Sequence, residues 1–247
     1  MEPIAVLLAT FFALFVSSVA GYGGSLVLVP AFVVILGPRE GIALAGLVLA
    51  CNNVVKCVAY RRSLALRQGW PLLVVTAAGV VVGTRVLIVV PEHALVGGIV
   101  VVAIASFAVE LAGRAGGRLS TPERLNVVKR RSVLPMTAGS SILSGATGSS
   151  GPLKGMAIRH LGLPRLEHVG LASAASLAGD ALKSGILADA GLLPAMSLWV
   201  VLAAIPMMPL AAWVGLRTNR RISEDTFKWV FWGVVGGYSL RMAGLWF

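Results

Sequence analysis

The stretch Gly21-Tyr22-Gly23-Gly24-Ser25-Leu26 interrupts an apolar run, and a related stretch follows 127 residues later. It pairs without a gap with Gly148-Ser149-Ser150-Gly151-Pro152-Leu153. The same shift also pairs Glu40 with Glu167, Asn53 with Asp180, and Lys56 with Lys183. Chance matches in so apolar a chain would be mostly leucines and alanines. We therefore interpret the chain as two copies of one unit, each with a glycine-broken segment and a lysine in an apolar span, a pattern typical of secondary transporters.

The composition excludes an ordinary soluble domain. Of the 247 residues, 57% are hydrophobic and only 13% are charged, whereas soluble domains carry roughly a quarter charged residues. The formal net charge of +11 does not require a nucleic-acid partner, because the basic residues lie in short loops between apolar runs. We expect an integral membrane protein whose partner is the lipid bilayer, with no nucleic acid bound.

Loop charges predict the topology. Six apolar stretches are near the ~20 residues that cross the hydrocarbon core, namely 41–60, 70–90, 94–112, 169–187, 192–216 and 227–245. The positive-inside pattern places the basic loop after residue 60 and the basic linker 113–131 in the cytoplasm. The span 41–60 then runs inward and its counterpart 169–187 runs outward. The chain is thus predicted to consist of a first membrane repeat, 1–112, the linker, and an inverted second repeat, 132–247.

The glycine-broken segments 4–36 and 133–163 are expected to be re-entrant helical hairpins. The apolar pieces flanking the second break are about 12 residues long, which is short for a span. Irregular backbone at membrane depth is tolerated only where it is buried in protein or lines a watery cavity. The first segment has a longer first arm, so two full spans remain open there. The predicted fold is all-α, with two inverted repeats that each contain a hairpin and three transmembrane helices.

The two breaks are the first candidate for a substrate site. Glycine backbone can approach a ligand closely, and the helix after each break presents unpaired N–H groups and the positive end of its dipole. The alternative is that these glycines only let helices pack closely. The residues expected to bind an anion here are Gly23, Gly24, Ser25, Thr147, Ser149, Ser150 and Gly151.

Three lysines in apolar segments are the second candidate. A lysine in a span costs roughly 2.5–3.5 kcal/mol on insertion scales, so it is usually kept for a function. We expect Lys56, Lys154 and Lys183 to attract the anion, and Asn53 to assist them. Asp180 lies three residues before Lys183, on the same helix face, and is the candidate for coupling to protons. Snorkelling of Lys56 or Lys154 to the interface, and an Asp–Lys pair that only neutralises itself, are the alternatives.

Catalytic motifs are not found in the sequence. It contains no Walker motif, no Ser-His-Asp set and no Rossmann fingerprint after a strand. Cys51 and Cys57 lie six residues apart on one predicted helix, and neither has a second Cys or His at ligand spacing. We therefore expect a protein that is not an enzyme and that uses no cofactor and no metal.

These residues resemble a known family. The run Gly21-Tyr22-Gly23-Gly24-Ser25-Leu26-Val27-Leu28-Val29-Pro30 is similar to the Gly-x-Gly-Gly-Gly-…-Val-Pro signature of the sulfite exporter TauE/SafE family. Pro38-Arg39-Glu40-Gly41, Tyr60-Arg61-Arg62 and Gly79-x-x-x-Gly83-x-Arg85 also match its first repeat. The resemblance covers most of the chain. It implies a multi-pass carrier of the bacterial inner membrane for sulfite, thiosulfate or an organosulfonate such as sulfoacetate.

The chain departs from the family pattern at both breaks. Ser25 stands where a third glycine is usual, and the second break carries Thr147, Ser149 and Ser150. We expect a secondary transporter that moves a sulfur oxyanion by alternating access, coupled to protons or to the membrane potential; a homodimer is one arrangement open to it. The alternatives are an anion channel and a non-transporting membrane assembly factor.

Overall fold

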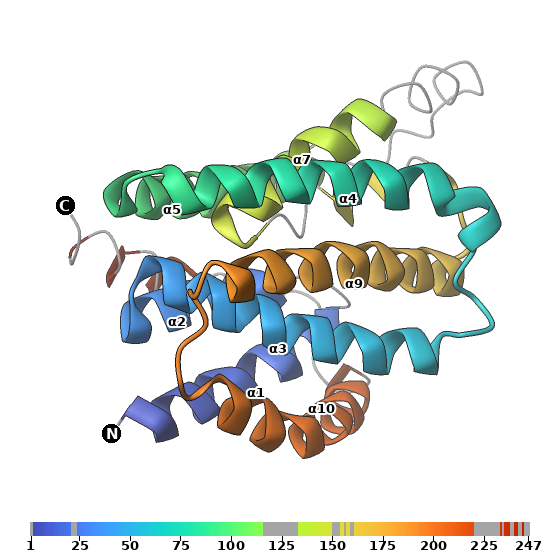
Figure 1. Ribbon diagram of the computed structural model, residues 1–247. Coiled ribbons are helices and arrows are strands. Elements are labelled where there is room, and N and C mark those ends of the chain that lie inside the picture. Colours follow the sequence, from blue (N-terminus) through green and yellow to red (C-terminus); the bar gives the residue numbers. More distant parts are fainter. Residues whose placement is uncertain are drawn as a thin grey trace.

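The computed structural model describes residues 2–20, 24–115, 133–149 and 161–219, the pairs 154–155 and 157–158, and seven positions between 233 and 244. This described part of the chain is helical and contains no strand. Figure 1 shows the helices in three layers, with α4, α5 and α7 in the first, α3 and α9 in the middle, and α1 and α10 in the third. The all-α prediction is confirmed for these residues.

The first two helices form the arms of a hairpin. α1 (Glu2–Ala20) packs against α2 (Gly24–Leu36), which leads into α3 (Pro38–Ala59) through one residue. That residue is Gly37, whose φ of +90° favours glycine, and Pro38 suits a first helical turn. A Cβ on Gly41 would lie 2.6 Å from the backbone of Phe32, so α2 and α3 pack backbone to backbone. The N-terminus and the α2–α3 junction lie at one end of the molecule (Figure 1).

The middle layer joins the two halves of the sequence. α3 lies beside α9 (Arg165–Asp189), and the two helices run in opposite directions (Figure 1). α4 (Leu66–Val89) packs on both α9 and α7 (Val133–Thr147). The contact of α4 with α7 depends on small residues, because a Cβ on Gly145 would lie 2.5 Å from the carbonyl oxygen of Val80. A Cβ on Gly83 would overlap the carbonyl oxygen of Ile142. Glycine is used here for close helix packing.

Two further long helices pack on those already described. α5 (Glu92–Ala115) packs on α7, and α10 (Ser197–Asn219) packs on α1 and α3. α4 begins at Leu66, four residues before the predicted span, and α5 extends into the predicted linker. α10 begins five residues after the start of the predicted span 192–216. Before it, Gly191 has a φ of +69° and the Ser197 hydroxyl donates a hydrogen bond of 2.6 Å to the Pro194 carbonyl. The predicted span 227–245 and the rest of the linker lie largely outside the described residues.

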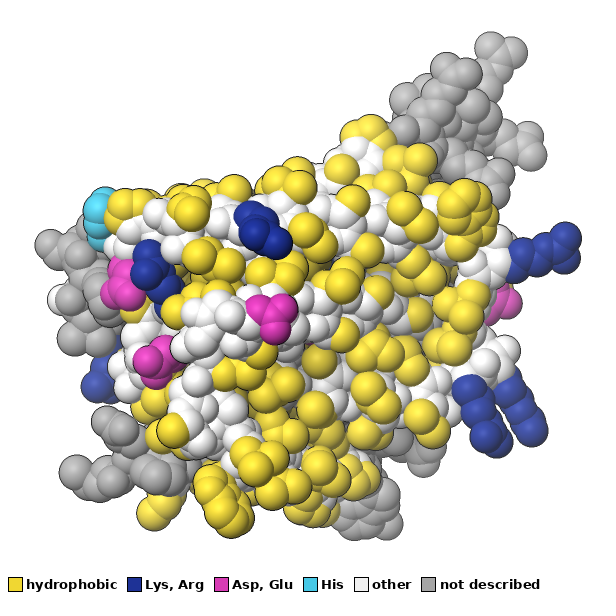
Figure 2. Space-filling view, viewed as in Figure 1, with side chains coloured by type: hydrophobic (Ala, Val, Ile, Leu, Met, Phe, Trp, Pro, Cys, Tyr) yellow, Lys and Arg dark blue, Asp and Glu magenta, His cyan; other side chains and the backbone are white. Residues whose placement is uncertain are grey.

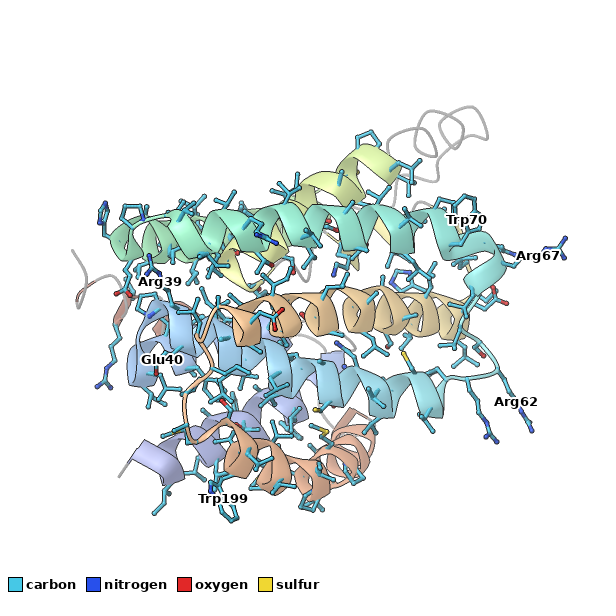
Figure 3. The ribbon with its side chains drawn as sticks, in the orientation of Figure 1. Arg39, Glu40, Arg62, Arg67, Trp70 and Trp199 are labelled. Carbon is cyan, nitrogen blue, oxygen red and sulfur yellow. The ribbon has the colours of Figure 1, made fainter. Side chains whose placement is uncertain are left out.

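The surface has the character expected of a protein in lipid. Figure 2 shows mostly apolar side chains across the middle of the visible face, with charged ones gathered mainly towards the two ends. Figure 3 places Arg62 and Arg67 at one end, and Arg39 and Glu40 at the other. Two of the described helices, α3 and α4, are long and apolar enough to cross a membrane, and α2, α5 and α10 contribute shorter apolar stretches. Exposed apolar surface of this extent needs an apolar environment.

Candidate functional site

The candidate site centres on the carboxylate of Asp180, which α9 presents to α3. Its Oδ1 accepts a hydrogen bond of 3.0 Å from Nζ of Lys183, and its Oδ2 accepts one of 3.0 Å from Nδ2 of Asn53. The relative exposures of Asp180, Lys183 and Asn53 are 9%, 1% and 6%. A buried charge is costly unless it is paired and hydrogen-bonded. These bonds therefore hold the carboxylate between the two halves of the sequence.

Gly46 of α3 makes room for the lysine. A Cβ at this position would lie 2.7 Å from Cε of Lys183 and 3.4 Å from Oγ of Ser184. Gly46 precedes Asn53 by two helical turns, so both residues lie on the face of α3 that meets α9. The sequence analysis missed Gly46 and Ser184. The signal in the sequence was a glycine seven positions before Asn53. Only the packing of α3 on α9 shows that this glycine makes room for Lys183.

Two more lysines interact electrostatically with the same carboxylate. Lys154 is 8% exposed and interacts electrostatically with Asp180, by attraction, and with Lys183, by repulsion. Lys56, on α3, is half-buried and is also attracted by Asp180. Three lysines and one aspartate give these four side chains a formal net charge of +2. Such a charge in an apolar interior favours the binding of an anion.

Neutral donors lie beside the charged residues. The Oγ of Ser184 and the Nδ2 of Asn52 are buried and have no hydrogen-bond partner within the described residues. Buried polar groups in proteins nearly always have a partner. Ser184 follows Lys183 on α9, and Asn52 precedes Lys56 by one turn of α3. Both groups can therefore donate to a ligand held by the lysines.

The second break lies against α2 and α3. Gly148 has a φ of +76°, and a Cβ there would lie 3.0 Å from side-chain atoms of Val29 and of Ile42. Ile42 precedes Gly46 by one turn of α3, so the break approaches the site from this side. Next to it, the hydroxyl oxygens of Ser149 and Ser25 are 3.1 Å apart. The structure thus brings Ser25 of the first predicted break into contact with Ser149 of the second, next to the glycine that packs on Ile42.

The other predicted residues of the breaks are placed only in part. Oγ1 of Thr147 lies 2.8 Å from the Leu143 carbonyl oxygen and 3.1 Å from that of Ser149, so its hydroxyl proton is used within the break. Gly24 is buried at the start of α2. Gly23, Ser150 and Gly151 lie outside the described residues.

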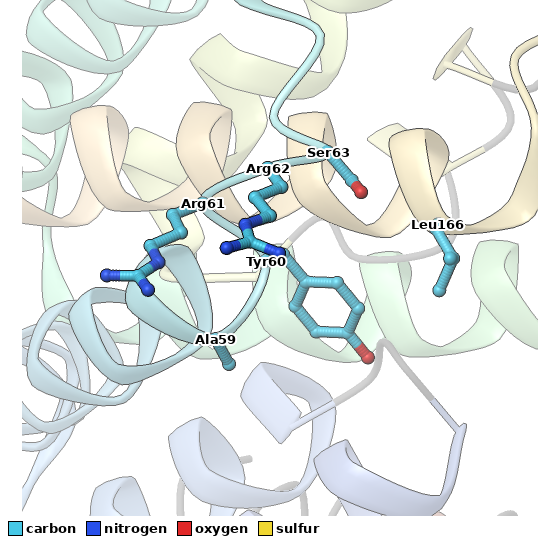
Figure 4. Close-up of a pocket in the computed structure, with 6 residues that line it drawn as sticks. All are labelled: Ala59, Tyr60, Arg61, Arg62, Ser63 and Leu166. Carbon is cyan, nitrogen blue, oxygen red and sulfur yellow. The ribbon is translucent and has the colours of Figure 1, made fainter.

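A pocket of ≈ 440 Å³ opens at the arginine-rich end of the molecule. Figure 4 shows Tyr60, Arg61, Arg62 and Leu166 around it, between the end of α3 and the start of α9. It lies apart from Asp180, but Tyr60 follows Lys56 by one helical turn, and its backbone N–H donates to the Lys56 carbonyl oxygen at 2.8 Å. The pocket therefore lies one turn of α3 from the lysine.

The titratable side chains of the site can be compared with the ligand sets of metal centres. Among the described residues there is no group of three or more His, Cys, Asp or Glu side chains that could hold a metal ion. Cys51 and Cys57, both on α3, are not joined in a disulfide. What the site offers is charge, hydroxyls and amides around a carboxylate, which can bind and release an anion.

Comparisons with known proteins identify the class of the chain. No curated protein and no solved structure matches it. The sequence profile of the family described as Sulfite exporter TauE/SafE matches residues 6–242. This is almost the whole chain, and it includes the helices that carry the buried lysines. The chain therefore belongs to the TauE/SafE sulfite exporter family, a family of membrane transporters.

Proposed function

We propose that this protein is a secondary transporter that moves a small sulfur-containing oxyanion across the bacterial inner membrane by alternating access. The substrate is sulfite, thiosulfate or an organosulfonate such as sulfoacetate. The observation that carries this proposal is the group of charged side chains at Asp180, in which two buried lysines and the half-buried Lys56 outweigh one carboxylate. A site built of lysines, hydroxyls and amides suits an oxyanion with many hydrogen-bond acceptors. Family membership supports a sulfur anion as the substrate.

The hydrogen bond between Asn53 and Asp180 supports an inverted repeat. These residues occupy the same position in the two copies, 127 residues apart, and their side chains are in contact. A residue can touch its own counterpart only close to the axis that relates two copies. Because α3 and α9 run in opposite directions, this axis would lie in the membrane plane, as in other transporters with inverted repeats. The bond then marks the middle of the membrane.

The same symmetry relates the positions of Lys56 and Lys183. Lys56 and Lys183 each lie three residues beyond the central bond, about 4.5 Å along their own helix. Since α3 and α9 are antiparallel, the two lysines would lie on opposite sides of the midplane. An anion passing from one lysine to the other would cross the centre of the membrane. This placement supports alternating access around a fixed central site.

The short helices support the predicted hairpins. α2 has 13 residues and α7 has 15, fewer than the ~20 needed to cross the hydrocarbon core. The hairpin of α1 and α2 has both its ends at one side of the molecule, whereas α7 runs inward from the other side (Figure 1). We infer that two hairpins enter from opposite faces and meet where Ser25 contacts Ser149.

We assign to Asp180 the coupling of anion transport to protons. Its carboxylate competes with a substrate anion for the ammonium group of Lys183, since both bind the same cation. Protonation of Asp180 would release the lysine to the substrate. The pocket at the arginine-rich end, which loop charge assigns to the cytoplasm, would lead anions towards Lys56.

The test is uptake by purified protein in liposomes. We would measure radiolabelled sulfite, thiosulfate and sulfoacetate, with and without an inward proton gradient. We expect saturable uptake of at least one anion, and faster uptake with the gradient. Uptake that does not saturate would favour a channel. No uptake of any of the three would leave the assembly-factor alternative.

A further inference from the structure

The hydroxyl group of Ser184 is buried without a hydrogen-bond partner. Other buried hydroxyls donate to the backbone of their own helix: those of Thr84, Thr137 and Ser173 lie 2.7 or 2.8 Å from the carbonyl oxygen four residues earlier. The Asp180 carbonyl has the same spacing from Ser184. Ser184 is nevertheless 5% exposed and its Oγ has no partner within the described residues. A buried polar group of this kind requires an explanation.

The surroundings of Ser184 distinguish it from the other hydroxyls of this kind. In the described part of the chain, the further buried hydroxyls without a partner are those of Thr76, Ser106 and Ser141. Ser184 lies beside a cation, because a Cβ on Gly46 would lie 3.5 Å from Nζ of Lys183 and 3.4 Å from Oγ of Ser184. The ammonium group and the hydroxyl group thus lie around one point on the surface of α3.

This point suits an oxygen atom of an anion. Nζ of Lys183 carries three protons and donates one of them to Asp180. The hydroxyl of Ser184 has one proton to donate. Hydrogen bonds between a charged donor and an oxyanion are among the strongest in proteins. An oxygen can lie closer to both donors than a methyl carbon can, because it forms hydrogen bonds with them.

We propose that Ser184 binds the substrate anion together with Lys183, and that one oxygen of the anion accepts hydrogen bonds from both residues beside Gly46. This assignment rests on the proposed transport function and identifies a residue that sets the affinity of its site. The hydroxyl has no partner in the substrate-free protein and obtains one when the anion binds. The cost of burying it alone is thus recovered as affinity for the anion.

The first test needs no substrate and compares two serines of α9. We expect Ser184→Ala to raise the unfolding temperature of the substrate-free protein in detergent by roughly 2–4 °C, because it removes a buried hydroxyl that has no partner. Ser173→Ala is the matched control. Its hydroxyl donates to the Val169 carbonyl at 2.8 Å, so its loss should not raise the unfolding temperature. No rise in Ser184→Ala, or an equal rise in both variants, would overturn the proposal.

The second test measures the binding of sulfite, thiosulfate and sulfoacetate. The rise in unfolding temperature with the concentration of each anion gives its apparent Kd. We expect Ser184→Ala to bind the anion that the wild-type protein binds about tenfold more weakly, because Lys183 then holds the oxygen alone. Ser173→Ala should bind it as the wild type does. A Kd that is unchanged in Ser184→Ala would overturn the proposal.

A double variant tests whether the two donors meet at Gly46. In Gly46→Ala the new Cβ occupies the point between Nζ and Oγ, so the oxygen can no longer reach both donors. We therefore expect Ser184→Ala to weaken binding by less than about twofold when it is added to Gly46→Ala. Additive effects would overturn the proposal. If none of the anions stabilises the wild-type protein, the proposed function fails, and the unfolding temperatures of the two serine variants still decide whether the Ser184 hydroxyl is an unused donor.

Discussion

Asn53 and Asp180, which occupy the same position in the two halves of the sequence, are joined by a hydrogen bond of 3.0 Å between their side chains. The amide donates and the carboxylate accepts, so a neutral residue of the first half is paired with a charged residue of the second half. Lys183 completes the group through the other carboxylate oxygen. These two positions therefore differ in charge, and their side chains meet where α3 packs on α9.

Asp180→Asn is expected to uncouple transport from protons. The substitution keeps the shape of the side chain but removes both the negative charge that competes for Lys183 and the group that takes up a proton. We predict uptake with an apparent KM at least several-fold lower than that of the wild type, because the anion no longer has a competitor. An inward proton gradient should no longer accelerate it. Unchanged stimulation by the gradient would show that another residue carries the proton.

Gly46→Ala is expected to weaken anion binding. The new Cβ would lie 2.7 Å from Cε of Lys183, so the lysine must move although it is almost fully buried. We predict a several-fold rise in the KM of uptake, with normal abundance in the membrane. Gly185→Ala is the matched control, because a Cβ on this α9 glycine meets no atom within 4 Å. Equal KM values in the two variants would remove Gly46 from the site.

Gly83→Ala is expected to damage folding and not binding specifically. Its Cβ would overlap the backbone carbonyl oxygen of Ile142, which cannot swing away as a side chain can. Overpacking of this kind costs about 1–3 kcal/mol or more. We predict a lower unfolding temperature in detergent and reduced abundance. Gly139→Ala on α7, where a Cβ meets nothing within 4 Å, should behave like the wild type in both measurements.

Arg61→Ala/Arg62→Ala is expected to slow the capture of anions from the side at which the pocket opens. Both arginines line that pocket, and clefts of one charge raise the local concentration of the opposite ion. We predict a higher KM at low ionic strength and little change at high ionic strength, where exposed charges are screened. Arg67→Ala, outside the pocket, is the control. A defect that persists in high salt would indicate a structural role instead.

The sequence predicted the helices and the pairing of Asp180 with Lys183 because both depend on local pattern. An apolar stretch of about 20 residues predicts a span wherever it occurs, and a spacing of three places two residues on one helix face. α3, α4, α5 and α9 follow these predictions closely. Gly191 and Pro194 were local signals that α10 begins after them and not at residue 192. The apolar run that starts at residue 192 obscured these signals.

The contacts between the two halves of the sequence could not be predicted in the same way. The approach of Gly46 to Lys183, the pairing of Ser25 with Ser149 and the burial of Lys154 all depend on how α2, α3 and the second break pack in three dimensions. A lysine that snorkels and a lysine that is buried beside a carboxylate have the same local sequence. The roles of Gly23, Ser150 and Gly151 stay predictions.

The measurement that tests the central claim most directly is counterflow in liposomes. Vesicles that contain the wild-type protein would be loaded with unlabelled sulfite, thiosulfate or sulfoacetate and diluted into a trace of the same anion in labelled form. A carrier that exposes one central site alternately to each side must accumulate the label transiently above equilibrium, and Lys183→Ala at equal abundance should abolish this. Label that only equilibrates, or accumulation that is unchanged in Lys183→Ala, would contradict an alternating-access carrier built around this lysine.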